Sequence, residues 1–391
     1  MLSPLRFLPV LLLALTVSAP VPAQESKSAQ AAKLAAKLQP FVDSHTLAGA
    51  VLLVANRDGV LATETVGSAD IAAGKPMRPD NVFWIASMSK PVTATALMLL
   101  IDEGKVALDD PVEKYLPEFK NLWLAVEQDQ DHQLLKRPGQ KITVRHILSH
   151  TSGMPFRSAL EQPTLDALPL SVAVRSYAMT PLQFEPTTKY QYSNAGINTA
   201  GRIIEVVTGL AYEDFLQQRL FDPLGMKDTT FWPNEEQVAR LARAYRPNKD
   251  KSGLEETRID QLQYPLNRRE GRYPMPAGGL FSTAADMAAF CRMLLNGGEL
   301  NGKRYLSADA VGQLAANQTG DLPTGYGLGF STDKRPNGTF GHGGALATNM
   351  QIDRERGLVL IYMVQHAGYL NDTGKQIYPT FAETARALFA K

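Results

Sequence analysis

The segment Ser87-Met88-Ser89-Lys90 combines a potential nucleophile with a potential base at a spacing that chemistry can use. A serine hydroxyl is a poor nucleophile until a base removes its proton. A lysine three residues later on a helix lies one turn away on the same face, within reach of that hydroxyl. The motif occurs a second time at residues 331–334, in a polar turn that we interpret as solvated surface.

The residues around Ser87 predict the helix that this spacing needs. An apolar, strand-like run at 82–86 precedes Ser87, and Pro91 follows shortly after. Proline is tolerated in the first turn of a helix and breaks a helix interior, so the helix should begin close to Ser87. The uncharged run 92–101 is long enough for a buried helix, and Gly104 provides a C-terminal stop.

Tyr192 and Asn194 form a second candidate group, just before a predicted helix that begins near residue 196. A tyrosine can act as a base only if nearby positive charge lowers its pKa from about 10, and Lys90 could supply that charge. The Asn194 amide could hold Lys90 or a substrate carbonyl. Taken alone, the pattern favours a buried tyrosine beside a helix-capping asparagine.

His342-Gly343-Gly344 is a third candidate group, between two strand-like runs. Glycines let a substrate approach the backbone closely. The next amide, that of Ala345, could donate a hydrogen bond to a developing oxyanion. The alternative is a tight turn that carries a surface histidine.

Other chemistries find little support. His146 and His150 stand four apart on a predicted helix, but Ile147 occupies the place of the glutamate that a zinc-protease helix carries. The chain has no Gly-x-Ser-x-Gly elbow, which disfavours an α/β-hydrolase, and no glycine-rich phosphate loop. We therefore expect neither a metal site nor a cofactor.

Residues 1–23 have the pattern of a secretory signal: Arg6, an apolar stretch over 7–17, and a small-residue cleavage site at 21–23. The apolar stretch is shorter than the about 20 residues that a spanning helix needs, although an uncleaved anchor is the alternative. We expect a periplasmic or secreted protein with no stable membrane span after cleavage.

The chain has a single cysteine, Cys291, so it cannot form an internal disulfide. This fits a bacterial periplasm, where disulfides are permitted but not required. A net charge of only +1 argues against a nucleic-acid partner.

Strand-like runs near both ends of the chain bracket a mostly helical middle. The simplest assembly is an α+β fold (an α/β sandwich): an antiparallel sheet built from both termini, flanked by helices, with an inserted, mostly helical lobe. We expect one domain over 24–391, with the α/β part at about 24–104 and 275–391 and the lobe at about 105–274. The expected strands are 49–55, 60–66, 326–331, 339–342, 347–352 and 358–364; the expected helices include 28–44, with a kink or break at Pro40, 196–207, 212–221 and 379–389.

Taken together, the motifs resemble the serine β-lactamase and penicillin-binding family. The resemblance is to its class C-like branch of class C β-lactamases, D-alanyl-D-alanine carboxypeptidases, D-aminopeptidases and family VIII carboxylesterases. Ser87-x-x-Lys90, Tyr192-x-Asn194 and His342-x-Gly344 match its three motifs in order. The resemblance extends over nearly the whole mature chain and implies a β-lactamase/transpeptidase-like fold. Further matches are 150–153, 223–226 and 277–283.

The resemblance implies a role for each of these residues. Ser87 would attack a carbonyl and form an acyl-enzyme, and Lys90 and Tyr192 would share the work of the base. The amides of Ser87 and Ala345 would form the oxyanion hole. Water activated near Tyr192 would then release the acyl group.

The same resemblance implies that Asn194 and His342-Gly343-Gly344 bind the substrate, with Asn194 and His342 also tuning Tyr192. Class C β-lactamases usually carry lysine where His342 stands, and a histidine is largely neutral at pH 7. We therefore expect a serine hydrolase acting on small esters or amides. The alternatives are a D-alanyl-D-alanine carboxypeptidase or D-aminopeptidase acting on peptidoglycan fragments, a weak β-lactamase, and a non-catalytic module that binds cell-wall fragments.

Overall fold

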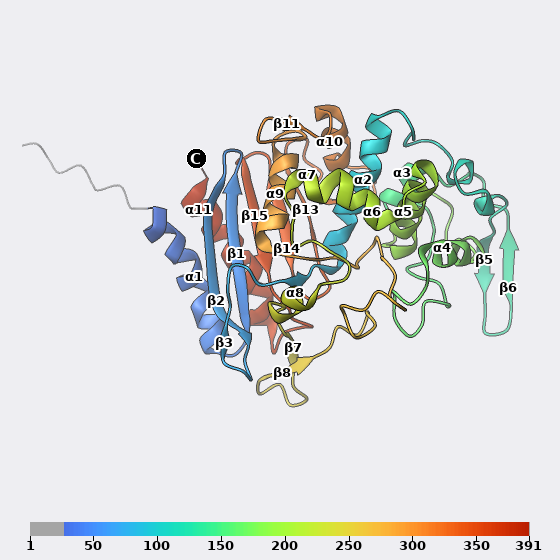
Figure 1. Cartoon of the computed structure of the whole chain (residues 1–391). Coiled ribbons are helices and arrows are strands. Elements are labelled where there is room, and N and C mark those ends of the chain that lie inside the picture. The colour runs from blue at the N-terminus through green and yellow to red at the C-terminus, as the bar shows by residue number, and fades with distance from the viewer. Residues whose placement is uncertain (1–26, 391) are drawn as a thin grey trace, which may run out of the picture.

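A seven-stranded antiparallel sheet forms the centre of the molecule (Figure 1). The computed structural model describes residues 27–390, so the predicted signal at 1–23 lies outside the described residues. Strands from the two ends of the chain meet where β1 pairs with β15. This confirms the predicted sheet built from both termini. In spatial order the strands are β12 (Ser331–Thr332), β13 (Thr339–Gly343), β14 (Asn349–Asp353), β15 (Leu358–Met363), β1 (Gly49–Asn56), β2 (Val60–Asp70) and β3 (Lys75–Pro76).

The interior strand β1 is apolar from Gly49 to Ala55 because both faces of the sheet are covered there. Its even-numbered side chains from Ala50 to Val54 pack against α1 (Lys27–Asp43) and α11 (Ile377–Phe389). Its odd-numbered side chains from Val51 to Ala55 join a second, larger core with α2 (Ser89–Asp102) and α9 (Ala284–Leu295). Figure 1 shows these two pairs of helices on opposite sides of the sheet.

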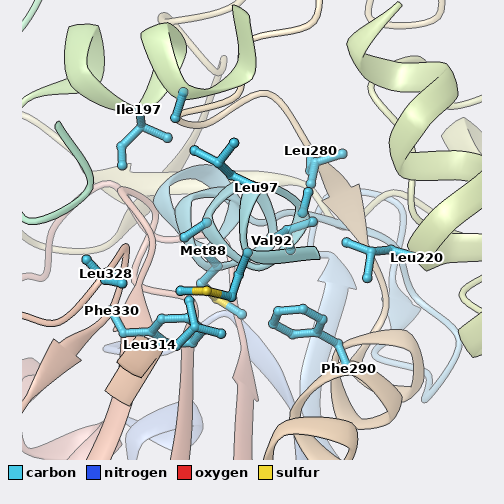
Figure 2. Packing of buried hydrophobic residues seen from close by; sticks show 14 of the residues in the cluster. Met88, Val92, Leu97, Ile197, Leu220, Leu280, Phe290, Leu314, Leu328 and Phe330 are labelled. Carbon is cyan, nitrogen blue, oxygen red and sulfur yellow. The ribbon is translucent and has the colours of Figure 1, made fainter. Parts of the chain in front are cut away.

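Helix α2 is buried from Ser89 to Leu100. A helix that is hydrophobic all round must be enclosed by other elements. Figure 2 shows Val92 and Leu97 from α2 and Met88 from the turn before it, surrounded by side chains from distant segments, among them Ile197 and Phe290. The catalytic motif predicted from the sequence is thus attached to the most enclosed helix of the fold.

The middle of the chain contains more helix than strand, with long irregular stretches between the helices. One apolar core runs from the sheet through α2 into α5 (Asn194–Thr208), so the two predicted parts share it; their boundaries near residues 104 and 275 stay a prediction. The remaining helices are α3 (Val144–Leu148), α4 (Leu170–Ala178), α6 (Tyr212–Leu216), α7 (Asp222–Leu224), α8 (Glu235–Ala239) and α10 (Ala308–Ala315), with the shorter helical segments η1 (Ala86–Met88), η2 (Val112–Lys114), η3 (Pro117–Phe119), η4 (Gln217–Phe221) and η5 (Asp372–Gln376). Short strand pairs outside the sheet are β4 (Phe83–Trp84) with β9 (Phe281–Ser282), β5 (Leu124–Gln128) with β6 (Gln133–Lys136), β7 (Ala244–Pro247) with β8 (Leu254–Thr257), and β10 (Glu299–Leu300) with β11 (Lys303–Arg304).

Two local predictions differ from the structure. The strand expected at 326–331 is reduced to β12, because the amides of Leu328 and Gly329 donate to carbonyls of other segments, Leu314 at 3.1 Å and Leu148 at 2.9 Å. Helix α1 continues through Pro40, which lies in its last turn, where few hydrogen bonds remain for proline to interrupt. Between residues 27 and 390, no helix combines the length and apolarity needed to cross a membrane.

A buried ion pair fixes the long irregular segment that leads to Ala277. Residues 258–280 contain no helix or strand. The Nε atom of Arg272 lies 2.7 Å from Oδ2 of Asp166, and the two side chains are 3% and 1% exposed. Arg272 also donates to the carbonyl of Phe231 at 3.2 Å. The pair therefore fixes the irregular segment that contains Arg272 to the irregular segment that contains Asp166, because neither segment has the backbone hydrogen bonds of a helix or strand.

Removing one partner of this pair should destabilise the fold. We expect Arg272→Met to lower the free energy of unfolding by about 3–5 kcal/mol, because it leaves the Asp166 carboxylate buried without its cation. The control is Arg268→Met, which removes an exposed pair with Glu270 in the same segment. Guanidinium denaturation of both variants measures the difference, and equal losses would contradict a stabilising role for the buried pair.

Candidate active site

Ser87 lies in a strained turn that connects β4 to α2. The turn is the 3₁₀ segment η1, and its first residue, Ala86, has a φ of +45°. Such a conformation is uncommon for a residue with a side chain and is often held in place at functional sites. The Ser89 hydroxyl donates to the Ala86 carbonyl at 2.7 Å and stabilises the turn. Ser87 is half-buried, so a substrate can reach it.

Lys90 extends from the first turn of α2 to Ser87 and is completely buried. Its Nζ atom lies 3.1 Å from Oγ of Ser87, 2.7 Å from Oδ1 of Asn194 and 2.7 Å from the carbonyl oxygen of Ala277. Burial lowers the pKa of Lys90 well below its ordinary value of 10.5, because a charged amine is unfavourable away from water. Three segments far apart in the sequence thus meet at one nitrogen atom.

The three partners of Lys90 can bind an ammonium, and they can also bind the neutral amine that a lowered pKa favours. A neutral amine has two N–H groups and one lone pair, whereas an ammonium has three donors and no acceptor. The carbonyl oxygens of Asn194 and Ala277 can only accept, so they take the two N–H groups. In the structure Nζ also donates to Oγ of Ser87 at 3.1 Å. In a neutral amine this third position holds the lone pair, which can accept the proton of the Ser87 hydroxyl. This arrangement suits removal of the serine proton by Lys90.

Tyr192 lies next to both residues. Its ring centre is 4.6 Å from Nζ of Lys90, and its hydroxyl is hydrogen-bonded to Ser87. Burial raises the pKa of Tyr192 above its ordinary value of 10, and the bond to Ser87 opposes this only in part. The tyrosine therefore stays protonated at neutral pH. A tyrosinate base would instead require a lowered pKa, so the structure shows the opposite shift.

His342 is buried in β13 and uncharged. Its Nδ1 donates to the carbonyl of Gly343 at 2.7 Å, so its Nε2 accepts from the Tyr326 hydroxyl at 2.9 Å. Burial, followed by the nearby Lys90, lowers the pKa of His342 to about 3. Both ring nitrogens therefore have protein partners, and the role of His342 in holding the substrate stays a prediction.

Gly344 brings the loop after β13 against the turn that carries Ser87. A Cβ atom at this position would lie 2.7 Å from the Ile85 carbonyl oxygen and 2.1 Å from Oγ1 of Thr348. Only glycine fits such a close backbone approach without displacing a neighbour. Ala345, the predicted oxyanion donor, follows directly in an exposed turn. Its role stays a prediction.

The sequence analysis missed several residues of this site. Ala277 takes part through its carbonyl, which leaves no side-chain signal, and Tyr326 was noted only within an expected strand. His150 was considered as a metal ligand and as part of the match at 150–153 but was given no role at the site, yet its ring centre lies 4.6 Å from that of Tyr192. Among residues 27–390, no three His, Cys, Asp or Glu side chains are grouped to hold a metal ion. In the second copy of the motif, Lys334 donates instead to the carbonyl of Leu322.

Comparisons with known proteins found relatives that match most of the chain. The sequence model of the beta-lactamase family matches residues 34–378. The chain is 31% identical to esterase EstB of Burkholderia gladioli, over 66% of this chain and 70% of the esterase. It is 32% identical to penicillin-binding protein 4 of Amycolatopsis lactamdurans, over 77% and 75% of the two chains. The solved structure of EstCE1, a hydrolase with promiscuous acyltransferase activity, superposes with a TM-score of 0.75 at 23% identity, covering 92% of this chain and 99% of EstCE1.

The two glycines after His342 should respond differently to a methyl group. In Gly344→Ala the new Cβ meets the Ile85 carbonyl and pushes the loop away from Ser87, so we expect kcat/KM to fall at least about 100-fold. In Gly343→Ala the nearest atom is the Asn349 Nδ2 at 3.4 Å, so we expect less than about a tenfold loss. Ester hydrolysis measures both, and a larger loss in Gly343→Ala would contradict the close approach at Gly344.

Proposed function

The chain belongs to the β-lactamase family, and from this premise we propose that it is a serine hydrolase that forms an acyl-enzyme on Ser87 and acts on small, uncharged esters. The observation that carries the proposal is the buried Lys90 amine, 3.1 Å from Oγ of Ser87 and bound on its other sides to two acceptors. A pure binding module needs no activated serine.

Acylation begins at Ser87. Lys90 takes the hydroxyl proton as Oγ attacks the ester carbon, and the amides of Ser87 and Ala345 stabilise the oxyanion. When the tetrahedral intermediate collapses, the leaving alkoxide takes the hydroxyl proton of Tyr192. The Lys90 ammonium then restores the proton of Tyr192. The acyl group stays on Ser87, the alcohol departs, and both side chains return to their neutral forms.

Deacylation uses the same groups with water in place of the alcohol. Water attacks the acyl carbon and gives its proton to the Tyr192 oxygen, while the hydroxyl proton of Tyr192 moves to Lys90. Collapse of the second intermediate returns that proton from Lys90 to Oγ of Ser87. The raised pKa of Tyr192 supports this relay, because a protonated hydroxyl can donate before it accepts.

Two features near Ser87 support an uncharged, partly apolar substrate. His342 is neutral and bound on both nitrogens, so it offers no cation to a substrate carboxylate. Phe156, 41% exposed, stacks on Tyr192 with ring centres 6.3 Å apart and offers an apolar surface beside the nucleophile. The relatives named as esterases are consistent with this choice. Export under the direction of residues 1–23, to the periplasm or beyond the cell, is part of the same proposal.

Hydrolysis of p-nitrophenyl butyrate by residues 24–391 tests the proposal. We expect activity that falls at least about 1,000-fold in Ser87→Ala, because no other group replaces the nucleophile. The matched control is Ser331→Ala, which removes the serine of the second, exposed motif copy and should leave the rate unchanged.

Intact mass after brief exposure to the ester should show one butyryl group on the wild-type protein and none on Ser87→Ala. Retained activity in Ser87→Ala would overturn the proposal. Faster turnover of a D-alanyl-D-alanine peptide or of nitrocefin than of the ester would replace the esterase by the peptidase or β-lactamase alternative.

A further inference from the structure

We propose that His150 is the positioning residue of Tyr192, holding its hydroxyl at Ser87 so that it can protonate the leaving alcohol. This inference rests on the proposed function and assigns a role to a residue that the mechanism above does not use.

Hydrogen bonds on both sides of Tyr192 go to His150. The amide of Gln191 donates to the His150 carbonyl at 2.9 Å, and the amide of Ser193 donates to Nδ1 of the His150 ring at 3.2 Å. The residues before and after Tyr192 are thus bound to one residue of another segment. This fixes the backbone from which the Tyr192 side chain extends.

The ring of His150 also fixes the ring of Tyr192. The two ring centres are 4.6 Å apart, and the Tyr326 ring lies at the same distance from His150. Tyr326 is in turn hydrogen-bonded to His342 in β13. His150 is only 1% exposed and packs between Tyr192 on one side and Tyr326 on the other. A shift of the His150 ring would therefore move the Tyr192 ring.

His150 acts here as a neutral acceptor. Because Nδ1 accepts from Ser193, the ring proton is on Nε2, which has no hydrogen-bond partner among residues 27–390. Burial, then the nearby Lys90 and His342, lowers the pKa of His150 well below its ordinary value of 6.5. The histidine therefore does not relay protons. It contributes an acceptor for the Ser193 amide and a ring that packs against Tyr192.

The backbone of His150 guides the choice of variants. His150 follows α3 with a φ of +61°, a left-handed conformation that asparagine tolerates better than most residues. His150→Asn keeps an acceptor for the Ser193 amide. His150→Phe keeps a ring without that acceptor, and His150→Ala removes both.

The test compares two butyrate esters that differ in their need for an acid. p-Nitrophenolate leaves without a proton, whereas ethoxide requires one. We expect His150→Ala and His150→Phe to lower kcat/KM about 100-fold on ethyl butyrate but less than about tenfold on p-nitrophenyl butyrate. All losses in this test are losses of kcat/KM, which reports acylation and excludes the deacylation step that the two esters share. His150→Asn should stay within about tenfold of the wild type on ethyl butyrate.

The matched control is His146→Gln, in helix α3, which precedes His150. It retains the capping box with Thr143 and should leave the ratio of the two rates unchanged. Equal losses on both esters, or an asparagine variant as impaired as the alanine variant, would overturn the positioning role. If His150→Ala does not fold, the phenylalanine and asparagine variants decide between these results.

Labelling of Ser87 by a fluorophosphonate separates this inference from the proposed function. Labelled wild-type protein together with equal losses on both esters overturns the positioning role alone. Wild-type protein that neither reacts at Ser87 nor hydrolyses either ester overturns the proposed function, and the role of His150 with it.

Discussion

The burial of a single amine, that of Lys90, is the constraint on which the rest of the site depends. An amine removed from water is costly unless its hydrogen bonds are satisfied. The fold meets this requirement with a side-chain carbonyl at the start of α5, a main-chain carbonyl at Ala277 and the nucleophile itself. Each comes from a different region, so helix α2, the helical middle and the irregular segment after residue 258 must be assembled before the site exists.

Burial also favours the neutral form of both reacting groups. It moves the pKa of Lys90 down and that of Tyr192 up, so the amine is free to accept a proton and the phenol retains one to give. Two groups whose pKa values are pushed in opposite directions can divide the work of base and acid. His342 is held neutral by the same means, and the centre needs no fixed cation. Such an arrangement fits an uncharged ester better than a substrate that carries a carboxylate.

Local sequence signals were enough to predict the sheet, the helix after Ser87 and the reach of Lys90 to the serine. Alternating apolar runs and a proline in the first turn depend only on neighbouring residues. Contacts between distant segments left weaker signals. Residue 277 binds Lys90 through its main-chain carbonyl, so the contact does not depend on the type of side chain there. His150 contributes through the packing of its ring against Tyr192, which the sequence does not show. Residues 326–330 have strand-like composition, yet the amides of Leu328 and Gly329 find partners in α10 and α3 rather than in the sheet.

The charge of Lys90 in the free protein is the most direct test of this account. In protein labelled with carbon-13 and nitrogen-15 lysine, the Cε and Nζ chemical shifts report the state of each amine, and comparison with Lys90→Met identifies the signal. The account predicts a neutral amine at pH 7 that gains its proton only well below pH 10.5, because burial disfavours the ammonium. An ammonium at pH 7 that titrates at or above pH 10.5 would contradict it, and the removal of the Ser87 proton would then require another base.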